Sequence, residues 1–367
     1  MKFLNFLLLA IPVSIFLQLS NFSPVLLFVA AGLSIIPLAG YMGKATEEIA
    51  IYVGPRVGGL LNATFGNAAE LIITVFALKA GLYEVVKASI TGSIIGNLLL
   101  VLGLSMLLGG FTYKTQKFNR AAAGMHTAML LMAVTGLIIP AVFLSTHESP
   151  AAEPLSLGVA AVLMIVYGLS LLFSLYTHKD VFRPSLENSE TPNWSKLKAV
   201  LILLVATLFV VIESEFLVAG IDPVVKTLGI SELFIGVIVL PIIGNAAEHS
   251  TSIMMALKDK MEISLEIAIG SSTQIALFVA PLLVFLGYFM GKPLDLLFTS
   301  YELVVIIMAT VITAVINMDG RSNWVRRSTT FVSLCHYGNR LSFCVIIVIS
   351  GNPFNLLSII HSIPASI

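Results

Sequence analysis

The chain has 367 residues, of which 57% are hydrophobic and 11% are charged, and its mean hydropathy is +0.99. A typical soluble domain carries about 25% charged residues, so this composition excludes a soluble globular fold and indicates a membrane protein with many spans. The formal net charge of zero argues against a nucleic-acid partner, and the two cysteines suit neither a disulfide framework nor a metal cluster.

Apolar segments long enough to cross a bilayer, about 20 residues each, follow one another along most of the chain. The first could pass for a signal peptide, but it has no clear small-residue cleavage site, so we expect a membrane helix there. The polar breaks are short except at 179–198. The predicted helices are 3–19, 23–43, 58–80, 83–109, 119–144, 155–178, 197–220, 229–257, 262–290 and 297–317.

Lysine and arginine are unevenly distributed between the two sets of loops. If the N-terminus is cytoplasmic, nearly all of them fall on the cytoplasmic side, and the other side holds Lys79, Lys87, Lys226 and Lys292. Cytoplasmic loops carry such an excess. The distribution therefore predicts a cytoplasmic N-terminus.

One pentapeptide, Gly-Asn-Ala-Ala-Glu, occurs at 66–70 and again at 244–248. Each copy lies within an apolar span, where a carboxylate costs on the order of 3 kcal/mol. In the predicted topology helix 58–80 leaves the cytoplasm and helix 229–257 returns to it. The two copies therefore form an inverted repeat that meets near the midplane, which is an architecture typical of transporters.

The repeat extends beyond the pentapeptide. Gly92-Ser93 lies 26 residues after Gly66, and Gly270-Ser271 lies 26 residues after Gly244. We therefore expect an all-α membrane protein with ten to eleven transmembrane helices. Its predicted parts are an N-terminal helix (1–22), a first repeat (23–178), a cytoplasmic linker (179–196), a second repeat (197–324) and an atypical tail (325–367).

The repeated motif supplies oxygen ligands on one helix face. Asn67 and Glu70 are three residues apart, as are Asn245 and Glu248, so each pair shares a face. Gly66 and Gly244 permit either close helix contact or an opened backbone. Oxygen ligands suit Ca²⁺ better than a soft metal, while Mg²⁺ demands a tighter octahedron. We expect Glu70 and Glu248 to be the metal-binding pair.

Charge balance suggests how such a site would work. Two ionised glutamates neutralise one divalent cation, whereas an empty site with both charges would be strongly disfavoured. Protons are the simplest substitute, which predicts that Glu70 and Glu248 exchange a cation for protons. The alternative is that both glutamates only bridge helices.

Polar residues on neighbouring spans are further candidates. Ser93, Asn97, Ser271 and Gln274 could bind the ion, orient the glutamates or simply bond a neighbouring helix. The candidates for a proton path or gate are Glu48, Glu213, Glu215 and His249. For the first three the alternative is a solvated interfacial charge, and for His249 it is a hydrogen-bonded buried imidazole.

At these motifs the chain resembles the Ca²⁺/H⁺ (cation/proton) exchangers of the calcium/cation antiporter superfamily. The resemblance runs from about Leu33 to Trp324 and is most specific at 66–72 and 244–249, with 62–65 and 271–277 also similar. It implies eleven helices, with one helix preceding two inverted five-helix halves.

The resemblance also implies site roles and a mechanism. Glu70 and Glu248 would bind the cation and the protons, with Asn67, Asn245 and nearby backbone oxygens beside them. The first two helices would slide over the core in alternating access. Ca²⁺ would be the transported substrate, with no resident cofactor and no enzymatic activity.

The tail departs from the family pattern. Residues 325–367 contain both cysteines and no acidic residue, and their longest apolar run, Cys344–Ile349, is far shorter than a span. We expect either a shifted reading frame or a divergent last helix at about 341–363, interrupted at Gly351-Asn352-Pro353.

Other functions and locations stay open at this point. Na⁺-coupled Ca²⁺ exchange, a passive cation channel and transport of Mn²⁺ are alternatives, whereas a membrane metallohydrolase would need a motif such as His-Glu-x-x-His, which does not occur. The short N-terminus favours a prokaryotic inner membrane over a vacuolar one. The sequence gives no oligomeric state.

Overall fold

The computed structural model describes residues 2–146, 152–177, 191–318, 320–323, 335–337 and 340–342. Within these residues nine helices are long and apolar enough to cross a membrane, and a shorter apolar helix covers 5–20. This confirms the all-α membrane fold. An eleventh helix would fall in the tail, where the described residues are the short strands β3 (Cys335–Tyr337) and β4 (Arg340–Ser342).

Most spans consist of more than one helical element in chain order. In the first half these are α1 (Lys2–Leu7), α2 (Ala10–Ser20), α3 (Pro24–Val53), α4 (Pro55–Phe65), α5 (Ala68–Lys79), α6 (Tyr83–Ile95), η1 (Gly96–Val101), α7 (Leu102–Thr112), α8 (Arg120–Thr146), α9 (Ala152–Leu172) and η2 (Phe173–Thr177). In the second half they are α10 (Lys196–Ala219), α11 (Ile221–Leu228), α12 (Glu232–Phe234), η4 (Ile235–Val239), α13 (Leu240–Leu257), α14 (Met261–Gln274), η5 (Ile275–Val279), α15 (Ala280–Phe289) and α16 (Ser300–Asn317).

Two predicted helix boundaries near the N-terminus are wrong. The first helix, expected to be continuous over 3–19, is interrupted by a turn between α1 and α2. The second continues ten residues past the expected end at 43, because the polar residues that follow support a helix as well as a loop. It ends at Gly54, whose φ of 82° suits glycine, and Pro55 then starts α4.

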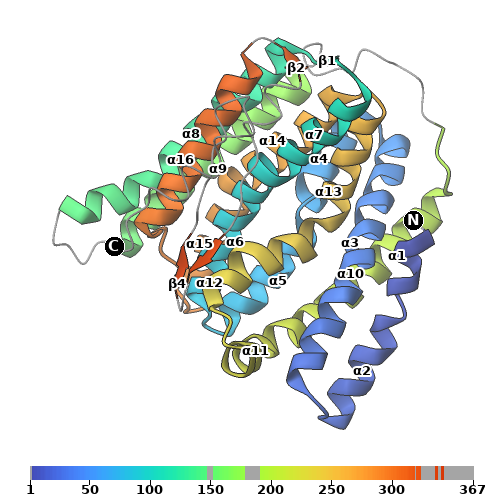
Figure 1. The fold of residues 1–367 in the computed structure, drawn as a ribbon, viewed down its shortest axis with the longest axis vertical. Coiled ribbons are helices and arrows are strands. Elements are labelled where there is room, and N and C mark those ends of the chain that lie inside the picture. The colour runs from blue at the N-terminus through green and yellow to red at the C-terminus, as the bar shows by residue number, and fades with distance from the viewer. Residues whose placement is uncertain are drawn as a thin grey trace.

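The helices form two groups (Figure 1). Helices α2, α3 and α10 lie along one flank, and α3 packs on α10 over much of its length. The other helices surround α6 and α14, whose buried residues belong to the larger of two apolar clusters. The flank meets this larger group where α3 packs on α13 and α10 packs on α5. These two contacted helices carry the repeated motifs.

The two ends of the molecule differ in charge. We call the end that holds most lysines and arginines the basic side, and the other end the opposite side. At the basic side, a short strand β1 (Thr115–Lys117) pairs antiparallel with β2 (Arg321–Asn323). No strands were expected there. In Figure 1 this pair is at the top, while α11 and the α2–α3 turn are at the bottom.

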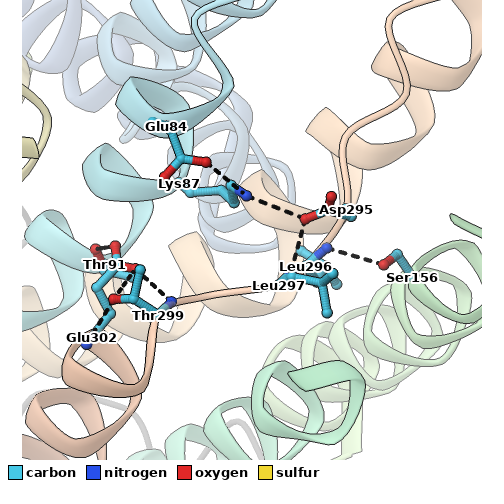
Figure 2. A network of polar contacts seen from close by, with 9 residues as sticks. All are labelled: Glu84, Lys87, Thr91, Ser156, Asp295, Leu296, Leu297, Thr299 and Glu302. Carbon is cyan, nitrogen blue, oxygen red and sulfur yellow. Dashed lines mark hydrogen bonds and ion pairs between the residues drawn. The ribbon is translucent and has the colours of Figure 1, made fainter. Parts of the chain in front are cut away.

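A polar network fixes the segment before α16 to α6 on the opposite side (Figure 2). Lys87 forms ion pairs with Glu84 at 3.2 Å and Asp295 at 3.3 Å. The buried Glu302 accepts bonds from the Thr91 hydroxyl at 2.9 Å and from the Thr299 backbone and hydroxyl. Three donors make Glu302 well suited to stay ionised while buried.

Candidate functional site

The first motif lies at a break between two helices. Helix α4 ends at Phe65 and α5 begins at Ala68, so Gly66 and Asn67 form the junction. The Ala63 carbonyl at the end of α4 accepts a hydrogen bond from the Tyr167 hydroxyl at 3.1 Å. The opened backbone foreseen for a glycine at this position is therefore present in the first copy.

The second motif lies inside a continuous helix, α13, but a π-helical segment, η4, precedes it. Pro241 explains that irregularity, since it lacks an N–H and its ring crowds the carbonyl four residues earlier, that of Val237. Here the backbone departs from α-helical geometry before the glycine rather than at it.

The Glu70 carboxyl is buried, with 2% of its surface exposed, and both of its oxygens are bonded. Oε1 accepts a hydrogen bond from the Ser93 hydroxyl, and Oε2 accepts one from the Asn245 amide at 3.2 Å. The same amide is 3.3 Å from the Ser93 oxygen. Residues from α5, α6 and α13 thus meet at Glu70.

The partner motif is built in an analogous way. The Ser271 hydroxyl donates to Asn67 Oδ1 at 2.9 Å, and the Asn67 amide donates to Gln274 Oε1 at 2.8 Å. Ser271 is also within hydrogen-bonding reach of the Glu248 carboxyl, which is close enough to Glu70 for the two charges to interact. Each asparagine therefore bonds residues of the other half.

The two motif glycines let the halves approach. A Cβ added to Gly244 would lie 3.3 Å from the Glu70 Cβ and 3.4 Å from its Cα. A Cβ added to Gly66 would lie 3.5 Å from Glu248 Oε1 and 3.6 Å from Gln274 Oε1. Each glycine thus faces the glutamate of the other motif, which keeps both carboxyls within one small volume.

Two buried oxygens at this site have no hydrogen-bond partner among the described residues: Asn245 Oδ1 and Glu248 Oε2. Unpaired buried acceptors are rare and call for a missing partner. Together with the other carboxyl and amide oxygens, they offer hard oxygen ligands of the kind that Ca²⁺ prefers. No group of three or more His, Cys, Asp or Glu side chains able to hold a metal occurs in the described part of the chain, so the charge available is that of the two glutamates.

Asn97 and His249 contact each other rather than the glutamates. His249 Nε2 is 2.9 Å from Asn97 Oδ1, and the Asn97 amide nitrogen is buried without a partner. The pair breaks the repeat symmetry, because Leu71 and Ile275 occupy the equivalent positions. The hydrogen-bonded histidine is the alternative weighed above.

The remaining gate candidates lie apart from the facing motifs. Glu48, at the basic end of α3, accepts bonds from the Asn193 and Trp194 backbone at 2.8 and 3.1 Å. Glu215 and Lys79 line a cavity of about 360 Å³ on the opposite side, between the ends of α5 and α10. Glu213 points to α2, where it contacts Ser14.

Equivalent glycines on α6 and α14 have different surroundings. A Cβ on Gly92 would lie 2.3 Å from the Val237 carbonyl oxygen, so α6 is pressed against η4. A Cβ on Gly270 would meet nothing within 4 Å. Glu248 is likewise less buried than Glu70. The pseudo-symmetric halves are therefore caught in different packing states, closed beside Gly92 and open beside Gly270.

Sequence reasoning missed Tyr167, Pro241 and Glu302. Glu302 had a detectable signal, because Thr299-x-x-Glu302 is a capping box and the structure contains both of its bonds. Pro241 stands three residues before the second motif, and a proline inside an apolar span marks irregular backbone. Tyr167 carried no local signal, since its contact with Ala63 joins segments about 100 residues apart.

An inverted repeat whose carboxyl-bearing motifs face each other within the membrane spans is the architecture of an ion transporter. Comparison with known proteins agrees. The family model described as sodium/calcium exchanger protein matches residues 23–176 and 198–349. The chain therefore belongs to the sodium/calcium exchanger family.

Characterised relatives are similar over nearly their whole length. A Ca(2+)/H(+) antiporter of Aphanothece halophytica is 48% identical over 343 residues, covering 88% of this chain and 91% of the relative. The Ca(2+)/H(+) antiporter ChaA of Bacillus subtilis is 45% identical, covering 87% and 92%. The solved structure of native YfkE is 42% identical with a TM-score of 0.78, covering 89% and 95%.

Proposed function

We propose that this protein exchanges Ca²⁺ for H⁺ across a membrane. The observation that carries the proposal is the facing of Glu70 and Glu248 across the inverted repeat, with Gly244 against one and Gly66 against the other. The names of the relatives that match along most of the chain support the same substrates. The protein is a transporter in this proposal, with Ca²⁺ as cargo and no resident cofactor.

The proposed cycle follows from charge balance. With Ca²⁺ bound, the two carboxylates cancel its charge and the unpaired oxygens of Asn245 and Glu248 gain a partner. When the ion leaves, protons neutralise the carboxyls, because two bare charges in a poorly solvated site repel each other and lose hydration. Asn67, Ser93 and Ser271 hold the ligands in place through their bonds across the halves.

Access to the site would alternate between the two sides. We take the open packing beside Gly270 as access from the basic side, which we propose is cytoplasmic. We keep His249 and Glu215 as candidates for a proton path or gate, whereas the contacts of Glu48 favour a role in fixing the linker end to α3. A cell membrane of prokaryotic type is the proposed location, and the lipid bilayer is the expected environment.

The decisive experiment is ⁴⁵Ca flux into proteoliposomes under imposed gradients. We expect an outward-directed proton gradient to drive Ca²⁺ accumulation inside the vesicles, with no need for Na⁺. Accumulation only with a sodium gradient would instead favour Na⁺-coupled exchange. Flux that never exceeds the electrochemical equilibrium of Ca²⁺ would favour a channel.

Calcium affinity is expected to rise with pH, because ligand carboxyls must lose their protons before they bind a metal. If two protons compete with one Ca²⁺, the apparent affinity rises by up to about 100-fold per pH unit below the titration range of the pair. Equilibrium binding of ⁴⁵Ca to the purified protein across that range measures the slope. A pH-independent affinity would contradict competition at the glutamates.

A further inference from the structure

Four glutamates in the described chain are buried: Glu48, Glu70, Glu213 and Glu302. Each of the other three accepts at least two hydrogen bonds. Glu213 differs, since its Oε1 contacts the Ser14 hydroxyl and its Oε2 is buried with no partner among the described residues. A carboxylate so poorly solvated would be strongly disfavoured.

A count of hydrogens gives the protonation state of this contact. The Ser14 oxygen lies 2.7 Å from the Ile11 carbonyl oxygen and 2.7 Å from Glu213 Oε1, and both distances are ordinary O–H···O bonds. Ser14 has one hydrogen and the Ile11 carbonyl has none. The second hydrogen must therefore come from Glu213, as a carboxylic acid that donates to Ser14 while Ser14 donates to Ile11.

No charged group compensates at this position. The ion pairs found among the described residues involve Lys87 only. Helix α10 packs on α2, α3, α5 and α11, and α2 has no titratable residue. Those on the other packed helices, and on α10 itself, have no printed contact with Glu213: Tyr41, Lys44, Glu47, Glu48, Tyr52, Glu70, Lys79, Asp222, Lys226, Lys196, Lys198 and Glu215.

We propose that Glu213 and Ser14 form a proton-dependent latch between the N-terminal helix α2 and helix α10. With the proton in place, the contact is neutral and α2 packs against α10 and α3. Loss of the proton leaves a buried anion with one possible donor, so the separated state, in which water reaches Glu213, gains. By linkage, the latch holds at low pH and weakens as the pH rises.

The latch lies apart from the transport site but on a related element. Helix α3, which α2 covers, approaches α13 closely at two glycines: a Cβ on Gly32 would lie 2.8 Å from Ile243, and one on Gly40 would lie 3.6 Å from Ala247. Release of α2 would therefore free one face of the α3–α10 pair. Proton concentration would then regulate the flank independently of proton binding at Glu70 and Glu248.

Hydrogen exchange of the full-length protein in nanodiscs tests the latch without any flux measurement. After correction for the intrinsic pH dependence of exchange, we expect peptides of α2 to lose protection at least several-fold between about pH 6 and pH 9. In Glu213→Gln the amide can still donate to Ser14 but cannot ionise, so protection should stay constant over this range.

Glu215→Gln is the matched control, since it removes a carboxyl two residues away that has no contact with α2, and it should behave like the wild type. Constant protection of α2 in the wild-type protein would overturn the latch, even if no variant folded. So would a loss of protection in Glu213→Gln as large as in the wild type. Because α2 exchange does not depend on Ca²⁺ transport, the latch can fail while the proposed exchange stands, and the reverse.

Discussion

Replacing Glu70 by glutamine is expected to abolish proton-driven Ca²⁺ accumulation. The amide keeps the size of the side chain but removes one of the two charges that balance the ion, and it cannot carry a proton in exchange. Removing one partner of a buried charge pair costs about 2–5 kcal/mol, or a roughly 30- to 4,000-fold loss of affinity. ⁴⁵Ca uptake into proteoliposomes under a pH gradient measures the loss.

Glu248→Gln should have the same effect, because the two glutamates occupy equivalent positions in the repeat and face each other. Glu84→Gln serves as the control, since that carboxyl is 65% exposed and the Lys87–Asp295 pair remains without it. Normal accumulation in either site variant would refute the two-carboxylate mechanism. A loss confined to one of them would show that the halves do not contribute equally.

The second large effect concerns two glycines at equivalent repeat positions. Gly92→Ala places a methyl group 2.3 to 2.7 Å from backbone atoms of Val237, which cannot move aside as a side chain could. Overpacking of this kind costs about 1–3 kcal/mol or more. We expect a lower thermal unfolding temperature in detergent, since α6 and η4 must separate.

Gly270→Ala should leave stability unchanged, because nothing lies within 4 Å of the added methyl. If the halves exchange packing states during transport, however, Gly270 must in turn approach the residue equivalent to Val237, which is Gly59 on α4. We then expect Ca²⁺ binding to persist while flux falls strongly. Normal flux in this variant would argue against a symmetric exchange of packing, and an unchanged stability of Gly92→Ala would show that α6 can withdraw from η4 without penalty.

Much of the architecture was predictable because the bilayer leaves few alternatives. Hydropathy located the spans, since a membrane helix must satisfy its backbone internally over a fixed length. The repeated pentapeptide and the matching Gly-Ser pairs indicated an inverted repeat. The boundaries that failed, at α1–α2 and at the end of α3, lie where polar residues suit either a helix or a loop.

Site partners were harder to predict than site motifs. Asn67 and Glu70 share a face by helical spacing alone, but the bonds from Asn67 to Gln274 and from Asn245 to Glu70 join halves more than 170 residues apart. Asn97 was proposed beside the glutamates and instead contacts His249. Spacing within a helix predicts neighbours on that helix, and it carries no information on which residue a facing helix presents.

The sequence by itself determined that this protein spans a membrane many times, that it consists of two related halves, and that each half carries one buried carboxylate, because hydropathy, repetition and charge are local properties. Only the tertiary structure decided that each motif glycine faces the other motif's glutamate, that Gly92 is closed in while Gly270 is open, and that Glu213 shares a hydrogen with Ser14. These features depend on how helices distant in the chain pack against one another, and packing is a property of pairs of surfaces that no single segment specifies.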